Sequence, residues 1–236
     1  MDWIKFIGKI GIGLGSVFGA GCDSGDIYPE QNNPANTRTI EVTCLLEHVE
    51  TIPTARERKL LWAAFESKDN LQQLYSERIT AADAGKEQKI LLAEVPEDAA
   101  YVAMVLTDQT SNVLHIFWGQ DIIPGKTDLT IDAGAVDLVS FERIQHQLFD
   151  QSCLQCHQVG NASAGLVLEE NSSYAAIVGR PSKTDEGKKI VQSGSLEQSE
   201  MYLRLTDTDD FHSKFSTLKD DDVNLLSVWI RTGALK

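Results

Sequence analysis

The sequence predicts two domains, an all-β sandwich followed by an all-α domain. This prediction depends on the length of 236 residues, on short alternating apolar runs between residues 38 and 132, and on a change to helical periodicity after Val139. A typical domain has ~150 residues, so the chain has room for two modest domains. We place the β-sandwich domain at residues 38–133 and the all-α domain at residues 138–236.

Composition and charge exclude several classes of protein. Hydrophobic residues make up 42% and charged residues 24% of the chain, which excludes a wholly disordered, collagen-like or polytopic membrane protein. The formal net charge is −14. A field of that sign repels phosphate backbones, so we expect no nucleic-acid partner. The 4 cysteines are too few for a disulfide scaffold, so their positions matter more than their number.

Residues 1–21 have the character of an export signal peptide. Lys5 and Lys9 form a basic start, and the uncharged Gly-rich stretch after them is shorter than the ~20 residues that span a bilayer. The string FGAGC, which ends at Cys22, resembles the lipobox of bacterial lipoproteins, in which the Cys carries the lipid. The alternative is a plain secretory signal with Cys22 free or disulfide-bonded. We expect an exported protein of the bacterial cell envelope, in the periplasm or at the cell surface, held on the membrane by a lipid anchor.

Residues 22–37 predict a flexible tether, and the residues after them predict antiparallel strands. The tether is rich in Asn, Pro, Asp, Ser and Gly and lacks apolar periodicity. Short runs rich in β-branched and aromatic residues then alternate with turn signals: TIEVTCLLEHV, RKLLWAAF, KILLAEV, YVAMVLTD, NVLHIFWG and DLTID. The stretch EVPEDAAYVAMVLTDQTSNVLHIFWG resembles small immunoglobulin-like or transthyretin-like sandwiches. We expect Cys44 to be a buried reduced thiol, and His48 and His115 to be strand histidines and not ligands.

An amphipathic helix is predicted at the start of the second domain. Phe141, Ile144 and Leu148 share one helical face. Gln145 and His146 fall outside that face, so we expect them to be solvated. The helix leads directly into a cysteine motif.

That motif, CLQCH at residues 153–157, has the C-x-x-C-H spacing of c-type haem attachment. The thiols of Cys153 and Cys156 are expected to add to the two vinyl groups of one porphyrin edge, while His157 binds the iron as the proximal ligand. A thioredoxin-like redox pair would need a βαβ context, which the surrounding pattern lacks. A zinc site would need a second close pair of ligands. We therefore expect one covalently attached haem c.

The region after His157 resembles a small class I cytochrome c domain. The likeness rests on three strings: GLVL from residue 165, SEMY from residue 199, and LKDDDVNLLSVWIRTGA from residue 218. It implies an all-α domain in which a haem packs among a few helices. It also implies that the helix before the motif crosses the C-terminal helix, where Trp229 is expected to pack.

The resemblance also implies a methionine as the sixth iron ligand, but the loop before the last helix contains none. His212 stands near that position, so we favour it as the distal iron ligand. The alternatives are Met201 as the distal ligand, an open iron, and a surface role for His212. Met201 and Leu205 share a helical face, which favours packing for Met201. Two other cations are expected as solvated charges or as partners of haem propionates: Arg180 and Lys183.

A haem iron with both axial positions filled cannot bind a substrate. We therefore expect an electron carrier rather than an enzyme, which passes single electrons to and from a redox partner protein or a small mediator. Two other functions stay open. A haem-based enzyme or small-ligand sensor would need an open sixth iron position, and a partner-binding β-sandwich lipoprotein would carry the haem only as an accessory.

Overall fold

A computed structural model describes residues 36–215 and 217–236. The predicted signal peptide at residues 1–21, Cys22 and all but the end of the tether lie outside the described residues. The described residues belong to one compact unit, so the proposed division between the two domains stays a prediction. No helix in this described part is long and apolar enough to cross a membrane.

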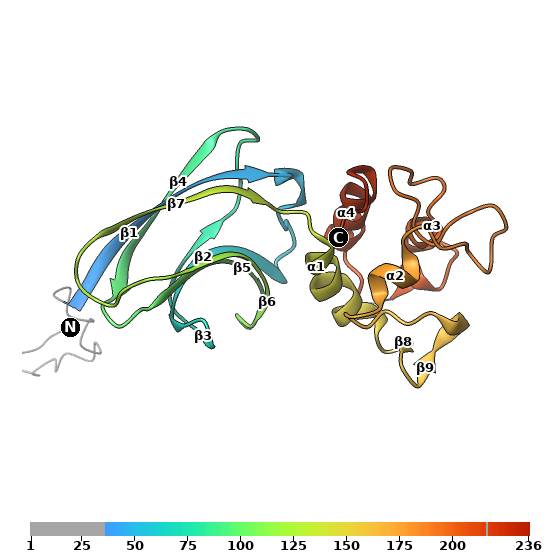
Figure 1. Cartoon of the computed structure of the whole chain (residues 1–236), viewed down its shortest axis with the longest axis horizontal. Helices are drawn as coiled ribbons and strands as arrows, with labels where there is room; N and C mark the ends of the chain where they lie inside the picture. The colour runs from blue at the N-terminus through green and yellow to red at the C-terminus, as the bar shows by residue number, and fades with distance from the viewer. Residues whose placement is uncertain (1–35, 216) are drawn as a thin grey trace, which may run out of the picture. The chain divides into compact units, whose positions relative to one another are not determined.

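Seven strands between residues 37 and 137 form two sheets (Figure 1). Their bounds are β1 Thr37–Glu47, β2 Arg58–Ser67, β3 Asn70–Ile79, β4 Glu87–Pro96, β5 Tyr101–Asp108, β6 Val113–Asp121 and β7 Leu129–Asp137. One sheet has the order β4-β1-β7 and the other β3-β2-β5-β6. Neighbouring strands are antiparallel except β1 and β7, which run parallel.

The two sheets share one apolar core, because each presents alternate residues to the other. Ile40 and Val42 of β1 belong to the same buried cluster as Leu60 and Trp62 of β2. Trp62 also packs edge-on against Trp118 of β6, with ring centroids 5.4 Å apart. The sandwich therefore fills its interior with its own side chains.

Short helices, loops and one small hairpin make up the rest of the described chain. A turn of 3-10 helix, η2 (Val49–Thr51), follows β1. After β7 come α1 Phe141–Ile144, η3 Gln145–Cys153, β8 His157–Gln158, β9 Asn161–Ala162, η4 Ser163–Gly165, α2 Ser173–Ile177, α3 Glu200–Thr206, η5 His212–Lys214 and α4 Asp220–Arg231. The segment η3 is a π-helix that continues α1. Phe141 of α1 and Trp229 of α4 pack with ring centroids 5.4 Å apart.

The prediction of an all-α C-terminal domain is wrong, and with it the predicted fold class of a sandwich plus a cytochrome c-like domain. Among the described residues, α4 is the one α-helix longer than two turns, with 12 residues. Loops and the small β8–β9 hairpin fill most of the stretch between Cys153 and α3. This stretch has no helical apolar period, and glycines with positive φ interrupt it, such as Gly165 (69°) and Gly179 (70°). The described chain is mainly β-sheet with a few short helices.

A buried polar network joins the sandwich to the C-terminal helices. Arg58 of β2 forms a buried ion pair with Asp222 of α4. Gln147 of η3 donates to Asp222 Oδ1 at 3.0 Å, and Arg143 Nε donates to Gln147 Oε1 at 2.9 Å. Arg143 Nη2 also donates to the carbonyl of Thr51 at 2.8 Å. Burial, with the charge of Arg58, lowers the pKa of Arg143 to about 9, which leaves its guanidinium charged at neutral pH. These contacts fix the helices that border the cavity described next.

Candidate functional site

A cavity of about 850 Å³ lies in the C-terminal region, and most of its lining is apolar. Its volume is within the range of small-molecule and cofactor sites, ~300–1,000 Å³. The lining includes the five residues that the sequence singles out for haem binding: Cys153, Cys156, His157, Met201 and His212. The remaining candidate, Cys22, lies outside the described residues.

The two thiols reach the cavity from the end of the π-helix. The wider turn of η3 closes with a hydrogen bond from the N–H of Leu154 to the carbonyl of Phe149, at 3.1 Å. The next turn brings the N–H of Cys156 to 3.1 Å from the carbonyl of Cys153, and neither cysteine forms a disulfide. Burial raises the pKa of Cys153 to about 12, and the charges of Asp222 and Asp150 add to the rise. Cys153 is therefore a protonated thiol at neutral pH.

His157, on β8, lines the cavity. Its Nδ1 lies 3.3 Å from the carbonyl oxygen of Leu166, which can accept a hydrogen bond from that nitrogen and so leave Nε2 unprotonated. Burial lowers the pKa of His157, and the neighbouring His212 adds to this effect. The ring is therefore neutral at neutral pH, with a lone pair available to a metal ion.

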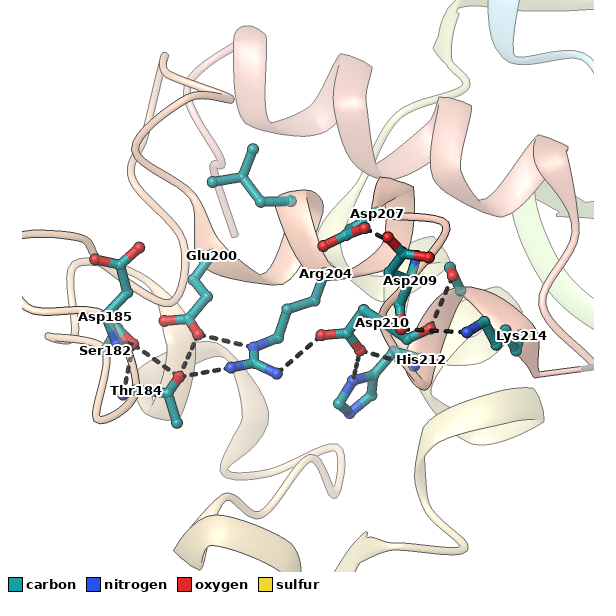
Figure 2. Close-up of polar contacts among 12 residues, drawn as sticks. Ser182, Thr184, Asp185, Glu200, Arg204, Asp207, Asp209, Asp210, His212 and Lys214 are labelled. Carbon is teal, nitrogen blue, oxygen red and sulfur yellow. Dashed lines mark hydrogen bonds and ion pairs between the residues drawn. The ribbon is translucent and has the colours of Figure 1, made fainter.

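His212, at the start of η5, is held by a chain of polar contacts (Figure 2). Its Nδ1 lies 2.7 Å from Asp210 Oδ1, while Asp210 Oδ2 accepts a hydrogen bond from Arg204 at 3.0 Å. Arg204 also donates to Glu200 at 2.7 Å and to Thr184 at 2.9 Å. Burial acts to raise the pKa of Asp210, but hydrogen bonds from His212 outweigh it and hold that pKa below its usual value. An ionised Asp210 fixes the His212 ring with Nε2 as its remaining nitrogen.

The rings of His157 and His212 lie next to each other in the cavity with nearly parallel planes. Their centroids are 6.3 Å apart and the planes differ by 21°. An imidazole nitrogen donates its lone pair in the plane of the ring, so a shared metal ion would lie at the ring edges, ~2 Å from each Nε2, and not between the ring faces. With each nitrogen ~1.2 Å from its ring centre, such binding places the two centroids at most ~6.4 Å apart. The two histidines are therefore close enough to share a metal ion, such as the iron of a haem, when their Nε2 edges turn toward it.

The other cavity residues have supporting roles. Met201 and Leu205 lie on α3 and pack against the apolar cluster of the C-terminal region. Arg180 donates through Nε to the carbonyl of Ala175 at 2.8 Å, and Lys183 donates to the carbonyl of Ala164 at 3.0 Å. Both cations are exposed at the cavity margin.

Sequence reasoning missed the residues that support His212. Asp210, Arg204 and Glu200 carry no motif, although a carboxylate two residues before a candidate ligand is a usable signal. The spacing of Glu200 and Arg204, four residues apart, is also typical of a helical ion pair. Their joint role depends on the fold, because α3 and η5 are brought together by the turn between them.

Comparison with protein-family models, with curated proteins and with solved structures gives no match to this chain. The assignment of the C-terminal region to the class I cytochromes c is therefore wrong. The three short strings that suggested it do not extend into a family match, and the region is not all-α. No solved structure matches the strands either, so their resemblance to immunoglobulin-like or transthyretin-like domains has no support from a known structure. The functional argument depends on the cavity and its residues alone.

Proposed function

We propose that this protein carries one covalently attached haem and transfers single electrons. The observation that carries the proposal is one cavity lined by both cysteines of a C-x-x-C-H motif and by two histidines, His157 and His212, whose ring centroids are 6.3 Å apart. When bound, the haem supplies an iron that changes between the ferric and ferrous states.

Cys153 and Cys156 would hold the haem by thioether bonds. Each S–H adds across a vinyl C=C bond, so that sulfur bonds to one carbon and the proton goes to the other, without any oxidant. This chemistry needs reduced thiols, and neither cysteine is in a disulfide. Arg180 and Lys183, at the margin of the cavity, are suited to pair with the carboxylates of the group.

His157 and His212 would occupy the two axial positions of the iron. With the Nδ1 atom of each ring engaged by an oxygen, both Nε2 atoms are free to bind. Filled axial positions exclude substrate from the iron, which favours electron transfer over an enzyme or a ligand sensor. Two imidazoles also stabilise ferric iron more than one imidazole and a thioether do, so the reduction potential should lie below that of Met/His-ligated haem.

The proposed location is the bacterial cell envelope. Covalent haem attachment takes place outside the bacterial cytoplasm, which agrees with the signal-like sequence and with lipidation at Cys22. The partner would be a redox protein or a small mediator. Cys22→Ser should release the folded protein from the membrane fraction, and unchanged membrane association would remove lipidation as the anchor.

A denaturing gel stained for haem tests the attachment. Haem should stay with the wild-type chain and be lost from the Cys153→Ala/Cys156→Ala variant. Cys44→Ala removes a thiol far from the cavity in sequence, so it is the matched control and should retain haem. Loss of haem from the wild-type protein on the gel would contradict covalent attachment.

Visible spectra of the purified protein test the ligation. Oxidised wild-type protein should be low-spin and should not bind carbon monoxide when reduced. His212→Ala should give high-spin iron that binds carbon monoxide, while Met201→Leu, which nearly conserves volume, should leave the spectrum unchanged. If Met201→Leu alone changes the ligation, Met201 is the ligand. If wild-type protein already binds carbon monoxide, the iron is open and the enzyme or sensor function replaces electron transfer.

A further inference from the structure

A second group of ligand side chains lies outside the cavity, where β6 meets the first helices of the C-terminal region. His115 of β6, Glu142 of α1 and His146 of η3 each offer one ligand atom, and these atoms all lie within 4.8 Å of one another. We propose that these three residues bind a divalent transition-metal ion, with zinc as the best-fitting case. The site is separate from the haem proposal, because it shares no residue with the cavity.

The donor set suits such an ion. Two imidazoles and one carboxylate are the protein ligands of many zinc sites, which keep a fourth position for water. Hard ions such as Mg²⁺ and Ca²⁺ prefer oxygen ligands throughout, so they fit this site poorly. Glu142 is exposed, so the fourth position would be open to solvent.

The spacing of the histidines also suits a tetrahedral ion. Nδ1 of His115 lies 3.2 Å from Nδ1 of His146. Two nitrogens bound to zinc at ~2.05 Å in tetrahedral geometry lie ~3.3 Å apart. The rings are tilted by 58° instead of stacked, so both nitrogens can direct lone pairs toward one point. Glu142 and His146 are four residues apart on one continuous helical segment, which puts them on neighbouring positions of its surface.

His115 is fixed in place before any ion binds. The side chain is 4% exposed and packs edge-on against Phe117, with ring centroids 4.7 Å apart. Burial, together with His146 and Arg143, lowers the pKa of His115 to about 3, so its ring is neutral at neutral pH. The cation of Arg143 opposes a metal ion, but its N–H groups donate to other oxygens, and its charge is partly offset by three carboxylates outside the site: Asp221, Asp222 and Asp137.

Binding would replace a hydrogen bond between the two rings. Without metal, one Nδ1 carries the proton that the other accepts. With metal bound at both Nδ1 atoms, that proton moves to Nε2 of the same ring, and no oxidant or reductant is needed. Because the ligands come from β6 and from α1–η3, the ion would link the sandwich to the C-terminal helices. The three ligands come together only in the folded chain, so the ion would stabilise the folded state relative to the unfolded state.

The test uses the purified full-length protein, with the cavity cysteines and histidines occupied by haem if the proposed function holds. After dialysis against EDTA, the protein is titrated with Zn²⁺ by calorimetry, and bound zinc is measured after gel filtration. Wild-type protein should bind one zinc per chain and show a higher Tm with zinc. Glu142→Gln and His146→Gln, at positions that are not fully buried, should each weaken binding at least tenfold and remove the Tm shift.

His48→Gln is the matched control. His48 is also a partly exposed histidine beside a carboxylate, with Nδ1 2.7 Å from Asp137 Oδ1, but it lies outside the site. Its zinc binding should equal that of the wild type. The Cys153→Ala/Cys156→Ala variant should keep this zinc site as well, which separates the result from the haem proposal. No bound zinc in the wild type, or equal binding in wild type, Glu142→Gln and His146→Gln, would overturn the proposal.

Discussion

The sandwich and the C-terminal region both bury a large apolar cluster, but they do so in different ways. In the sandwich, residues such as Ile40 and Trp62, each 0% exposed, pack against one another across two sheets. In the C-terminal region, buried residues such as Leu148, Phe149 and Leu168 line one side of a cavity of about 850 Å³. Similar side chains therefore produce a filled core in one region and the wall of a binding site in the other.

The two regions also differ in where their polar side chains lie. Most polar side chains of the strands lie on the surface, whereas the C-terminal region directs His157, His212 and two thiols into its cavity. The contact between the regions is polar and buried, through Arg58 and Asp222. The sandwich therefore has a filled interior, whereas the C-terminal region holds a cavity lined by thiols and imidazoles.

The largest effect is expected at the contact between the regions. Asp222→Asn would leave the buried guanidinium of Arg58 without its counter-charge, and it would weaken the cap of α4, where Asp222 accepts from the N–H of Lys219 at 2.9 Å. Breaking a buried ion pair costs ~3–5 kcal/mol. Urea unfolding should show this loss. Asp220→Asn makes the same chemical change at an exposed position in the same turn, and should cost less than ~1 kcal/mol.

A matched pair of leucine truncations compares the two interiors. Leu60→Ala, in the filled core, should cost ~2–5 kcal/mol because it creates a new cavity. Leu205→Ala removes a partly buried side chain that already borders open space, so it should cost about 1 kcal/mol or less in the haem-free state. Equal losses in urea unfolding would mean that the C-terminal region is packed as tightly as the sandwich.

Asp210→Asn tests whether the polar residues of the C-terminal region act on the iron and not on stability. The variant keeps an oxygen near His212 but removes the charge that makes the imidazole a stronger donor. The axial ligands should then stabilise ferric iron less, relative to ferrous iron. The reduction potential should rise by ~59 mV for each tenfold decrease in the ratio of their affinities for ferric and ferrous iron. Potentiometry should show no such rise for Asp209→Asn, whose side chain is exposed. A potential that moves equally in both variants would assign the effect to net charge.

The smallest effect concerns the thiol of the sandwich. Cys44 is buried, in no disulfide, and burial raises its pKa to about 11. An alkylating reagent at pH 8 should therefore modify Cys44 only when the sandwich unfolds. The rate of modification, followed by mass spectrometry, should increase in Leu60→Ala about tenfold for each ~1.4 kcal/mol of lost stability, because it follows the population of the unfolded state. Rapid modification of the native wild-type protein would contradict a closed core.

The strands could be predicted from the sequence, because burial alternates along β1 with a period of two and the turns between strands contain turn-forming residues. The side chains of the helix before the C-x-x-C-H motif were predicted less well. Gln145, expected in solvent, lies in the interior, where it is 1% exposed and donates to the carbonyl of Leu168 at 2.9 Å. It stands four residues after Phe141, so the ordinary helical period already puts it on the apolar face, and the prediction for Gln145 was wrong. His146 was likewise expected in solvent but lies beside His115. The approach of His146 to His115 depends on the packing of η3 against β6, which the period of one helix does not predict.

The all-α prediction failed for a different reason. The helical patterns at the two ends of the C-terminal region are real and form α1–η3 and α4, but for the Gly- and Ser-rich stretch between them the all-α fold was implied only by the resemblance to class I cytochromes c. That stretch has no period from which a helix could be predicted. Short strings with the spacing of a known family were not sufficient to define the fold.

The sequence by itself determined the C-x-x-C-H motif of Cys153, Cys156 and His157, because that spacing is local, and the haem hypothesis comes from that motif. It also determined the negative charge and the strand pattern. Only the tertiary structure decided that His212 lies beside His157 in one cavity, that Asp210 contacts His212, and that His115 contacts His146. These pairs come from segments whose approach depends on loops and on packing across the whole fold, and no local period of the chain encodes that approach.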